Sequence, residues 1–180
     1  DRMITKLKLT NFRSIGSSVE IPLDRLNLFA GVNGSGKSNV LRSLTFLREA
    51  MKLGLPGAVT NSNGIGSVRR HSTGHPHNVR IEVDLALDAG PSRYGFELTG
   101  DSVEEYRVKA EWAEVSLGTG EQFTYRVQDG VFSGPPGLQP NLDAQSLALT
   151  ALGGDPRLRP LSEFLSNTMV YSINPAALRV

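Results

Sequence analysis

Cysteine is absent from this chain of 180 residues. The sequence therefore has no disulfide framework, no thiolate zinc site and no cysteine nucleophile. Long apolar runs are absent too, since no stretch approaches the roughly 18 apolar residues that a membrane-spanning helix needs. No signal peptide opens the chain. These absences together predict a cytoplasmic protein without a membrane partner.

The composition is that of an ordinary globular domain, with 39% hydrophobic and 21% charged residues in 19.5 kDa. That length is sufficient to bury a sizeable core. Met3 follows Asp1 and Arg2, which we interpret as a native start behind a short vector-derived extension.

Charge is divided unevenly along the sequence. Residues 1–80 carry twelve Lys and Arg against four Asp and Glu, whereas residues 81–180 carry seven against fourteen. A basic segment suits a polyanion such as a nucleotide or DNA. The alternative, an uneven distribution of surface charge without a function, stays open at this point.

The first part of the sequence alternates between apolar and polar residues and then changes period. Strands are expected at residues 4–9, 19–23 and 26–30, with a turn at 11–16. From Ser38 the apolar residues Val40, Leu41, Leu44 and Leu47 recur at helical spacing, and this helix should end near Gly54.

The remainder has a period of two up to about residue 131, which predicts an antiparallel meander. We expect a single N-terminal lobe over 1–180, of α/β class. Its parts would be a P-loop strand–helix core (1–56), a long loop (57–78), the flanking antiparallel β-meander (79–132), and a connector followed by helices at 144–152 and 158–165 and a return strand at 168–173 (133–180).

One motif carries clear chemistry. Residues 31–38 read Gly-Val-Asn-Gly-Ser-Gly-Lys-Ser, which satisfies the P-loop (Walker A) pattern without a mismatch. The glycines allow successive backbone N–H groups to face a phosphate, and the following helix adds the positive end of its dipole. Lys37 can reach the β- and γ-phosphates, and the Ser38 hydroxyl can ligate Mg²⁺.

This P-loop, together with the preceding Asn11-Phe12-Arg13-Ser14, resembles the start of a RecF/SMC-type ABC ATPase head. It is most similar to bacterial ATPases of that kind labelled AAA family ATPases. The resemblance implies the N-terminal lobe of a P-loop NTPase core that binds ATP and Mg²⁺. It assigns nucleotide binding to Arg13, Asn33, Gly34, Ser35, Gly36, Lys37, Ser38 and Asn39, catalysis to Lys37, and the metal ligand to Ser38.

The parts needed for hydrolysis are not recognisable in the sequence. No apolar strand ends in Asp-Glu as a Walker B strand would, because the acids of residues 81–88 alternate with apolar residues. Residues 152–155, Leu-Gly-Gly-Asp, imitate an ABC signature but lack its serine. Asn174 stands about where a Q-loop glutamine is expected, and no switch histidine is evident.

Other clusters give weaker indications. His71, His75 and His77 lie together, but without a nearby carboxylate a metal site is disfavoured. The basic residues Arg69, Arg70 and Arg80 are candidate contacts to DNA phosphates, with a solvated loop as the alternative. Trp112 and Tyr106 are interpreted as packing residues.

The leading hypothesis is therefore ATP binding, with hydrolysis once a C-terminal lobe supplies the signature and Walker B elements. The resemblance implies a head-to-head dimer on ATP binding, acting with DNA or an effector protein in DNA maintenance, DNA repair or phage defence. A second hypothesis is a nucleotide-dependent switch or binding module that does not hydrolyse ATP. A small-molecule P-loop kinase is disfavoured, because antiparallel strands rather than further βα units follow the first helix.

Overall fold

The computed structural model describes residues 2–16, 18–22, 34–71 and 76–168. Within them the strands form one sheet in the order β2-β1-β3-β4-β5-β6-β7, and every neighbouring pair is antiparallel. The strands are β1 (Met3–Thr10), β2 (Val19–Pro22), β3 (Val79–Leu87), β4 (Gly90–Thr99), β5 (Arg107–Ser116), β6 (Gln122–Gln128) and β7 (Val131–Ser133).

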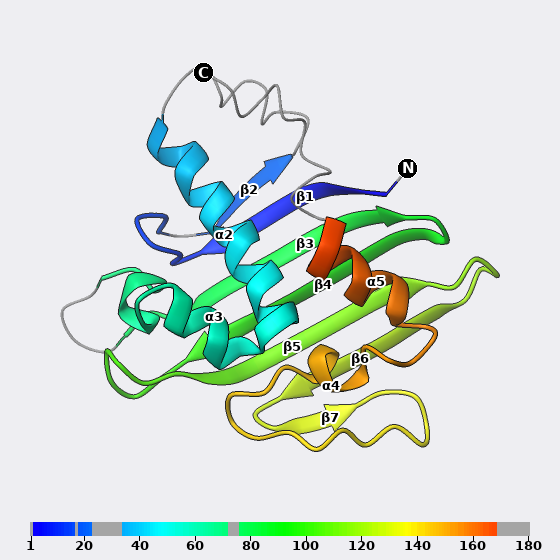
Figure 1. Ribbon diagram of the computed structural model, residues 1–180. Coiled ribbons are helices and arrows are strands. Elements are labelled where there is room, and N and C mark those ends of the chain that lie inside the picture. The colour runs from blue at the N-terminus through cyan, green and yellow to red at the C-terminus, as the bar shows by residue number, and fades with distance from the viewer. Residues whose placement is uncertain (1, 17, 23–33, 72–75, 169–180) are drawn as a thin grey trace.

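Helices cover one face of this sheet (Figure 1). The long helix α2 crosses the strands, and shorter helices lie beside it. In chain order they are α2 (Gly34–Leu53), α3 (Leu55–Asn61), the 3₁₀ turn η2 (Ile65–Ser67), α4 (Ala148–Leu152), α5 (Arg159–Glu163) and the π-helical turn η3 (Phe164–Thr168).

Residue alternation decides which face of the sheet is buried. Leu7 and Leu9 on β1 and Ile81 and Val83 on β3 have no exposed surface, and their register places them side by side. The core between sheet and helices also contains buried residues of α2, among them Leu44.

The opposite face of the sheet is polar and largely self-neutralised. Lys6 pairs with Asp84 at 3.5 Å, and Asp84 accepts a hydrogen bond from Arg93 at 2.9 Å. Lys8 pairs with Glu20 at 2.9 Å. Alternation thus produces one apolar and one charged face, as an antiparallel sheet with one solvated side requires.

The strands expected at 4–9 and 19–23 are confirmed as β1 and β2, and the antiparallel strands expected in 79–132 are confirmed as β3 to β7. One feature differs from the expectation of a meander flanking a separate strand–helix core. Strand β1 pairs with β3, so the N-terminal strands continue the sheet of the meander. The expected strands at 26–30 and 169–173 lie outside the described residues, and Thr168 belongs to the turn η3.

The prediction of a long loop over 57–78 is wrong for its first part, which is helical up to Asn61. Helix α3 begins at Leu55, directly after Gly54, whose φ of 80° reverses the chain at the end of α2. Pro56 occupies the first turn of α3, where no backbone N–H donor is required. Ala58 and Val59 are buried against the core, which provides the packing that stabilises so short a helix.

The helix expected over 144–152 begins only at Ala148. The carboxylate of Asp143 accepts the backbone N–H of Gln145 in a local turn at 2.8 Å, so it does not cap a helix there. The helix is capped instead from the sheet, because Glu111 on β5 accepts the backbone N–H groups of Ala148 and Leu149. The second helix, expected over 158–165, is confirmed as α5 and the start of η3.

None of the helices in the described part of the chain is long and apolar enough to cross a membrane.

Candidate functional site

The turn after β1 has an unusual backbone. Asn11 and Arg13 both adopt a φ of 52°, a conformation that residues other than glycine and asparagine rarely take. Backbone hydrogen bonds from Asn11 N to Gly16 O at 2.7 Å and from Ile15 N to Phe12 O at 2.9 Å close the turn. A strained arginine held by its surroundings is a pattern found at functional sites.

Segment 68–70 fixes this turn from outside. Arg13 N–H donates to the carbonyl of Val68 at 2.7 Å, and Arg70 N–H donates to the carbonyl of Asn11 at 2.9 Å. Phe12, 1% exposed, packs edge to face on the ring of Phe46 of α2 at 6.4 Å between centroids. The turn is therefore held by segment 68–70 on one side and by helix α2 on the other.

The N-terminal end of α2 forms the other wall. The first turn of the helix contains no acidic residue, so nothing opposes the positive end of its dipole. Ser38 is exposed there. Asn39 is buried, and its Nδ2 donates to Ser14 Oγ at 2.7 Å, which joins α2 to the turn after β1.

These walls enclose a cavity of about 580 Å³, here called the serine-side cavity. It brings together three of the residues assigned to nucleotide binding from the sequence, Arg13, Ser38 and Asn39. The remaining lining residues come from the same turn, from α2 and from the segment after α3, and they are Ser14, Arg42, Gly66, Ser67, Arg69 and His71. Among these described residues of the lining there is no carboxylate.

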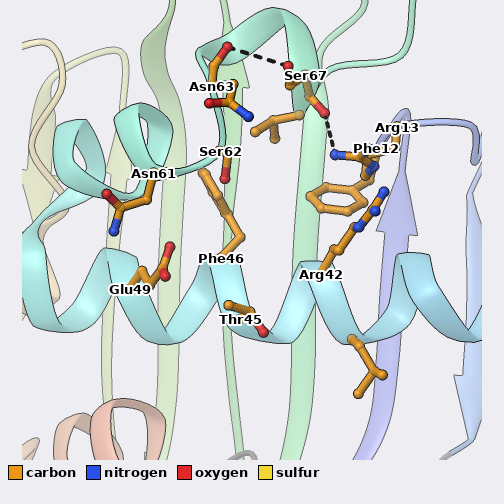
Figure 2. Close-up of a pocket in the computed structure, with 12 residues that line it drawn as sticks. Phe12, Arg13, Arg42, Thr45, Phe46, Glu49, Asn61, Ser62, Asn63 and Ser67 are labelled. Atoms are coloured by element: carbon orange, nitrogen blue, oxygen red, sulfur yellow. Dashed lines mark hydrogen bonds between the residues drawn. The ribbon is translucent and has the colours of Figure 1, made fainter.

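A second cavity of about 380 Å³ continues along α2 toward Glu49 and is called the helix-side cavity. Figure 2 shows Arg13 and Arg42 close together at one end, with Glu49 and Asn61 at the other. Arg13, Arg42 and Ser67 line both cavities, so they lie where the two meet.

Positive charge at this junction is not compensated within the described residues. Arg13 Nη1 donates to the carbonyl of Ser67 at 2.9 Å, while Arg42 has neither a hydrogen bond nor an ion pair there. Burial, and secondarily the charge of Arg42, lowers the pKa of the Arg13 guanidinium. Two cations with no anion between them favour binding of a negatively charged group.

Several residues assigned to nucleotide binding from the sequence lie wholly or partly outside the part of the chain that the structure describes. Asn33 lies outside the described residues. Gly34, Ser35, Gly36 and Lys37 form the first turn of α2, and the side chains of that turn are likewise outside them. Asn174, placed in a Q-loop from the sequence, also lies outside. Their roles remain predictions.

The structure gives Arg69 another role than the DNA contact considered from the sequence. Its side chain is 3% exposed, and its guanidinium donates to the carbonyls of Ser102 at 3.1 Å and Glu105 at 2.9 Å. Burial lowers the pKa of Arg69. An arginine buried on backbone carbonyls holds the loop between β4 and β5 in place and cannot reach a phosphate of DNA.

Arg80 also has structural partners. Its guanidinium lies 4.5 Å from the centroid of the Trp112 ring and pairs with Glu82 at 3.6 Å. Trp112 is 8% exposed, which confirms that it packs and does not offer a stacking surface. Tyr106, half-buried against the core, is a packing residue as well.

No group of three metal-ligating side chains occurs in the part of the chain that the structure describes, which contains His71 and His77 of the histidine cluster. His71 lines the serine-side cavity, and His75 lies outside the described residues.

The segment that imitates an ABC signature is a turn between α4 and α5. Asp155 accepts hydrogen bonds from the backbone and side chain of Arg157 at 2.9 and 3.0 Å, and these bonds lower the pKa of the carboxyl to about 2. The carbonyl of Gly154 accepts from Arg159 at 3.1 Å. These contacts give Leu152–Asp155 a structural role.

Arg42 is not among the candidate site residues identified from the sequence. The signal was present, because Arg42 lies four residues after Ser38 and residues at this spacing share a helix face. What the sequence could not give is the opposite wall, which is formed by the distant residues 66–71.

Comparison with known proteins agrees with this geometry. Residues 3–87 match the family described as the AAA ATPase domain. This range contains β1, the turn, α2 and β3, and therefore both cavities.

Two relatives are more specific. The DNA replication and repair proteins RecF of Shewanella denitrificans and Shewanella woodyi are each 27% identical over 150 residues, covering 73% and 78% of this chain. The match spans 35% and 37% of the lengths of those proteins. No solved structure matches the chain. These matches confirm the resemblance to the N-terminal lobe of a RecF-like ABC ATPase.

Proposed function

We propose that this chain binds Mg²⁺-ATP at the P-loop of residues 31–38, with the serine-side cavity receiving part of the nucleotide. The observation that carries the proposal is the position of Arg13, Ser38 and Asn39 on one cavity at the N-terminal end of α2. An arginine, a serine and an asparagine from two separate parts of the sequence meet at a helix N-terminus, where the helix dipole favours phosphate.

The residues present fit a nucleotide with its metal. The described residues of the cavity lining offer hydroxyl, amide and guanidinium donors and include no carboxylate, which suits a polyanion. The Ser38 hydroxyl would hold Mg²⁺, which then supplies neutralisation of phosphate charge. Lys37 would contact the β- and γ-phosphates, and Asn33 to Asn39 would surround them.

Hydrolysis is proposed only for a longer assembly. The lining residues that the structure describes include no carboxylate to position a water or hold the metal, and such groups would come from a C-terminal lobe with signature and Walker B elements. As in RecF/SMC-like ATPases, two heads would enclose two ATP molecules. Because the relatives are named for DNA replication and repair, we propose a role in DNA maintenance, with phage defence as the alternative setting.

A second candidate is a nucleotide-dependent switch without hydrolysis. It is favoured by the position of Arg13, whose side chain lines the cavity. The backbone N–H of the same residue donates to the carbonyl of Val68, so Arg13 connects the cavity to segment 68–70. In that case ATP binding would order the turn after β1 and segment 68–70, and this conformational change, not hydrolysis, would be the function.

Titration with labelled Mg²⁺-ATP tests the proposed function. The variant Lys37→Ala should weaken binding roughly 10- to 100-fold, because it removes a charge-assisted hydrogen bond to phosphate. Lys52→Ala serves as the matched control, since Lys52 lies in the last turn of the same helix. If both variants bind ATP as the native chain does, the proposed site is wrong.

A further inference from the structure

Of the two charged residues at the cavity junction, Arg13 is assigned to nucleotide binding by the family resemblance, whereas Arg42 is assigned by neither the resemblance nor the P-loop motif. It follows Ser38 by one helical turn, about 6 Å along the axis of α2. Side chains on a helix lean toward its N-terminus, so a long arginine at this position covers the turn that carries Ser38 and Asn39. Its place on the serine-side cavity agrees with this direction.

Arg13 approaches the same point from the opposite wall. Its backbone is fixed at a φ of 52°, and its guanidinium is oriented by the carbonyl of Ser67 at 2.9 Å. Figure 2 shows the side chains of Arg13 and Arg42 converging. The two side chains are close enough to interact electrostatically, because the charge of Arg42 contributes to the lowered pKa of Arg13.

A nucleotide bound by the P-loop leaves one phosphate without a charged side chain. The P-loop lysine reaches the β- and γ-phosphates, and the α-phosphate is left to backbone donors. A ligand that starts at the P-loop and enters the serine-side cavity would carry its α-phosphate past Ser38 toward the junction of the two cavities, where Arg13 and Arg42 lie.

We propose that Arg42 and Arg13 clamp the α-phosphate of the bound nucleotide, with Arg42 as a binding residue additional to the P-loop. The inference rests on the proposed function. An anion between the two guanidiniums removes their mutual repulsion and gives Arg42 the partner that it has nowhere among the described residues. Because the contact is to the α-phosphate, it is made equally to ATP and ADP.

The test compares ATP and ADP affinities, both with Mg²⁺, in three variants. Arg42→Ala should weaken both nucleotides by a similar factor of about 10, so the ratio of ATP to ADP affinity stays that of the native chain. Arg42→Lys should recover part of the lost affinity, because lysine keeps the positive charge but cannot donate two parallel hydrogen bonds as the guanidinium does. Arg48→Ala, which removes the same charge from the same helix outside both cavities, should change neither affinity.

The outcomes separate the two proposals. If Arg42→Ala weakens ATP alone, its contact is to the γ-phosphate and the inference is overturned. If Arg42→Ala and Arg48→Ala have equal effects, the loss is one of general charge, and the inference again fails while the ATP site stands. If the native chain binds neither nucleotide, or Lys37→Ala has no effect, the proposed function fails as well. Thermal unfolding of each variant confirms that Arg42, which is exposed, is not needed for folding.

Discussion

At the scale of single residues, Glu111 has the most unusual environment in the described structure. Its side chain is fully buried, yet it accepts hydrogen bonds from the hydroxyls of Tyr94 at 2.9 Å and Tyr125 at 2.7 Å and from two backbone N–H groups of α4. Burial raises the pKa of Glu111, and these donors act in the opposite direction. One carboxylate thus connects three strands to a helix.

Glu111→Ala should lower the free energy of unfolding by about 3 kcal/mol, because it leaves buried donors of Ala148 and Leu149 without an acceptor. Urea denaturation measures the change. Glu114→Ala provides the control, since Glu114 is exposed on the same strand and its removal should cost no more than about 0.5 kcal/mol. Equal effects would show that the buried network does not stabilise α4.

The sequence contained part of this information. In β5, Glu111 has the same phase as the core residues Ala113 and Val115, so an alternating pattern places a carboxylate inside. Such a residue must find donors, but its partners come from β4, β6 and α4, and no local pattern names them. The residues of the P-loop pattern differ, because their spacing alone is enough to predict phosphate binding.

At the scale of elements, the polar face of the sheet is organised around Trp112. Its ring lies over Gly95 of the neighbouring strand, and its Nε1–H donates to Glu82 at 2.6 Å. A Cβ at Gly95 would stand 2.6 Å from Cζ2 of that ring and 2.9 Å from the carbonyl of Ile81. Glycine is required there because a side chain and a backbone approach from two sides.

Gly95→Ala should therefore destabilise the protein by about 1–3 kcal/mol through overpacking. Since Trp112 is the only tryptophan, its fluorescence emission should shift in the same variant. Gly154→Ala is the comparison, because no atom lies within 4 Å of its added Cβ. Native-like emission and stability for Gly95→Ala would contradict the packing described.

Elements were predictable to different degrees. The long helix after the P-loop and the strands of the meander follow from periodicity, because each extends over several repeats. Helix α3 was not predicted because Gly54 and Pro56 normally mark the end of helical structure. In the folded chain the glycine turns the backbone and the proline begins the next helix, an outcome that depends on burial of Leu55 and Ala58.

At the scale of the whole molecule, the described residues place Arg13, Ser38 and Asn39 on one cavity and bring no carboxylate to it. Positive groups line the serine-side cavity, and the carboxylates of β3 lie elsewhere, with Asp84 paired to Lys6 and Arg93 on the opposite face of the sheet. The aligned relatives extend well beyond the matched region, which covers 35% and 37% of their lengths.

We expect the 180-residue chain to bind ATP without measurable phosphate release. Addition of a C-terminal lobe that carries signature and Walker B elements should produce release that depends on Lys37. A phosphate-release assay with and without that lobe makes the comparison, and Lys37→Ala in the assembled protein is the control. Lys37-dependent release by the chain alone would contradict this expectation, and none from the assembly would favour the switch.

The sequence by itself determined the phosphate-binding motif, the helix that follows it, the antiparallel strands and the resemblance to RecF-like ATPases. These follow from short-range spacing, which the chain carries in any conformation. The tertiary structure decided which residues share the site. Arg42 joined Arg13 because α2 packs against the turn after β1, whereas Arg69 was withdrawn from solvent by carbonyls more than thirty residues away. Burial and long-range partners, which no local pattern encodes, determine whether an arginine meets a ligand or supports the fold.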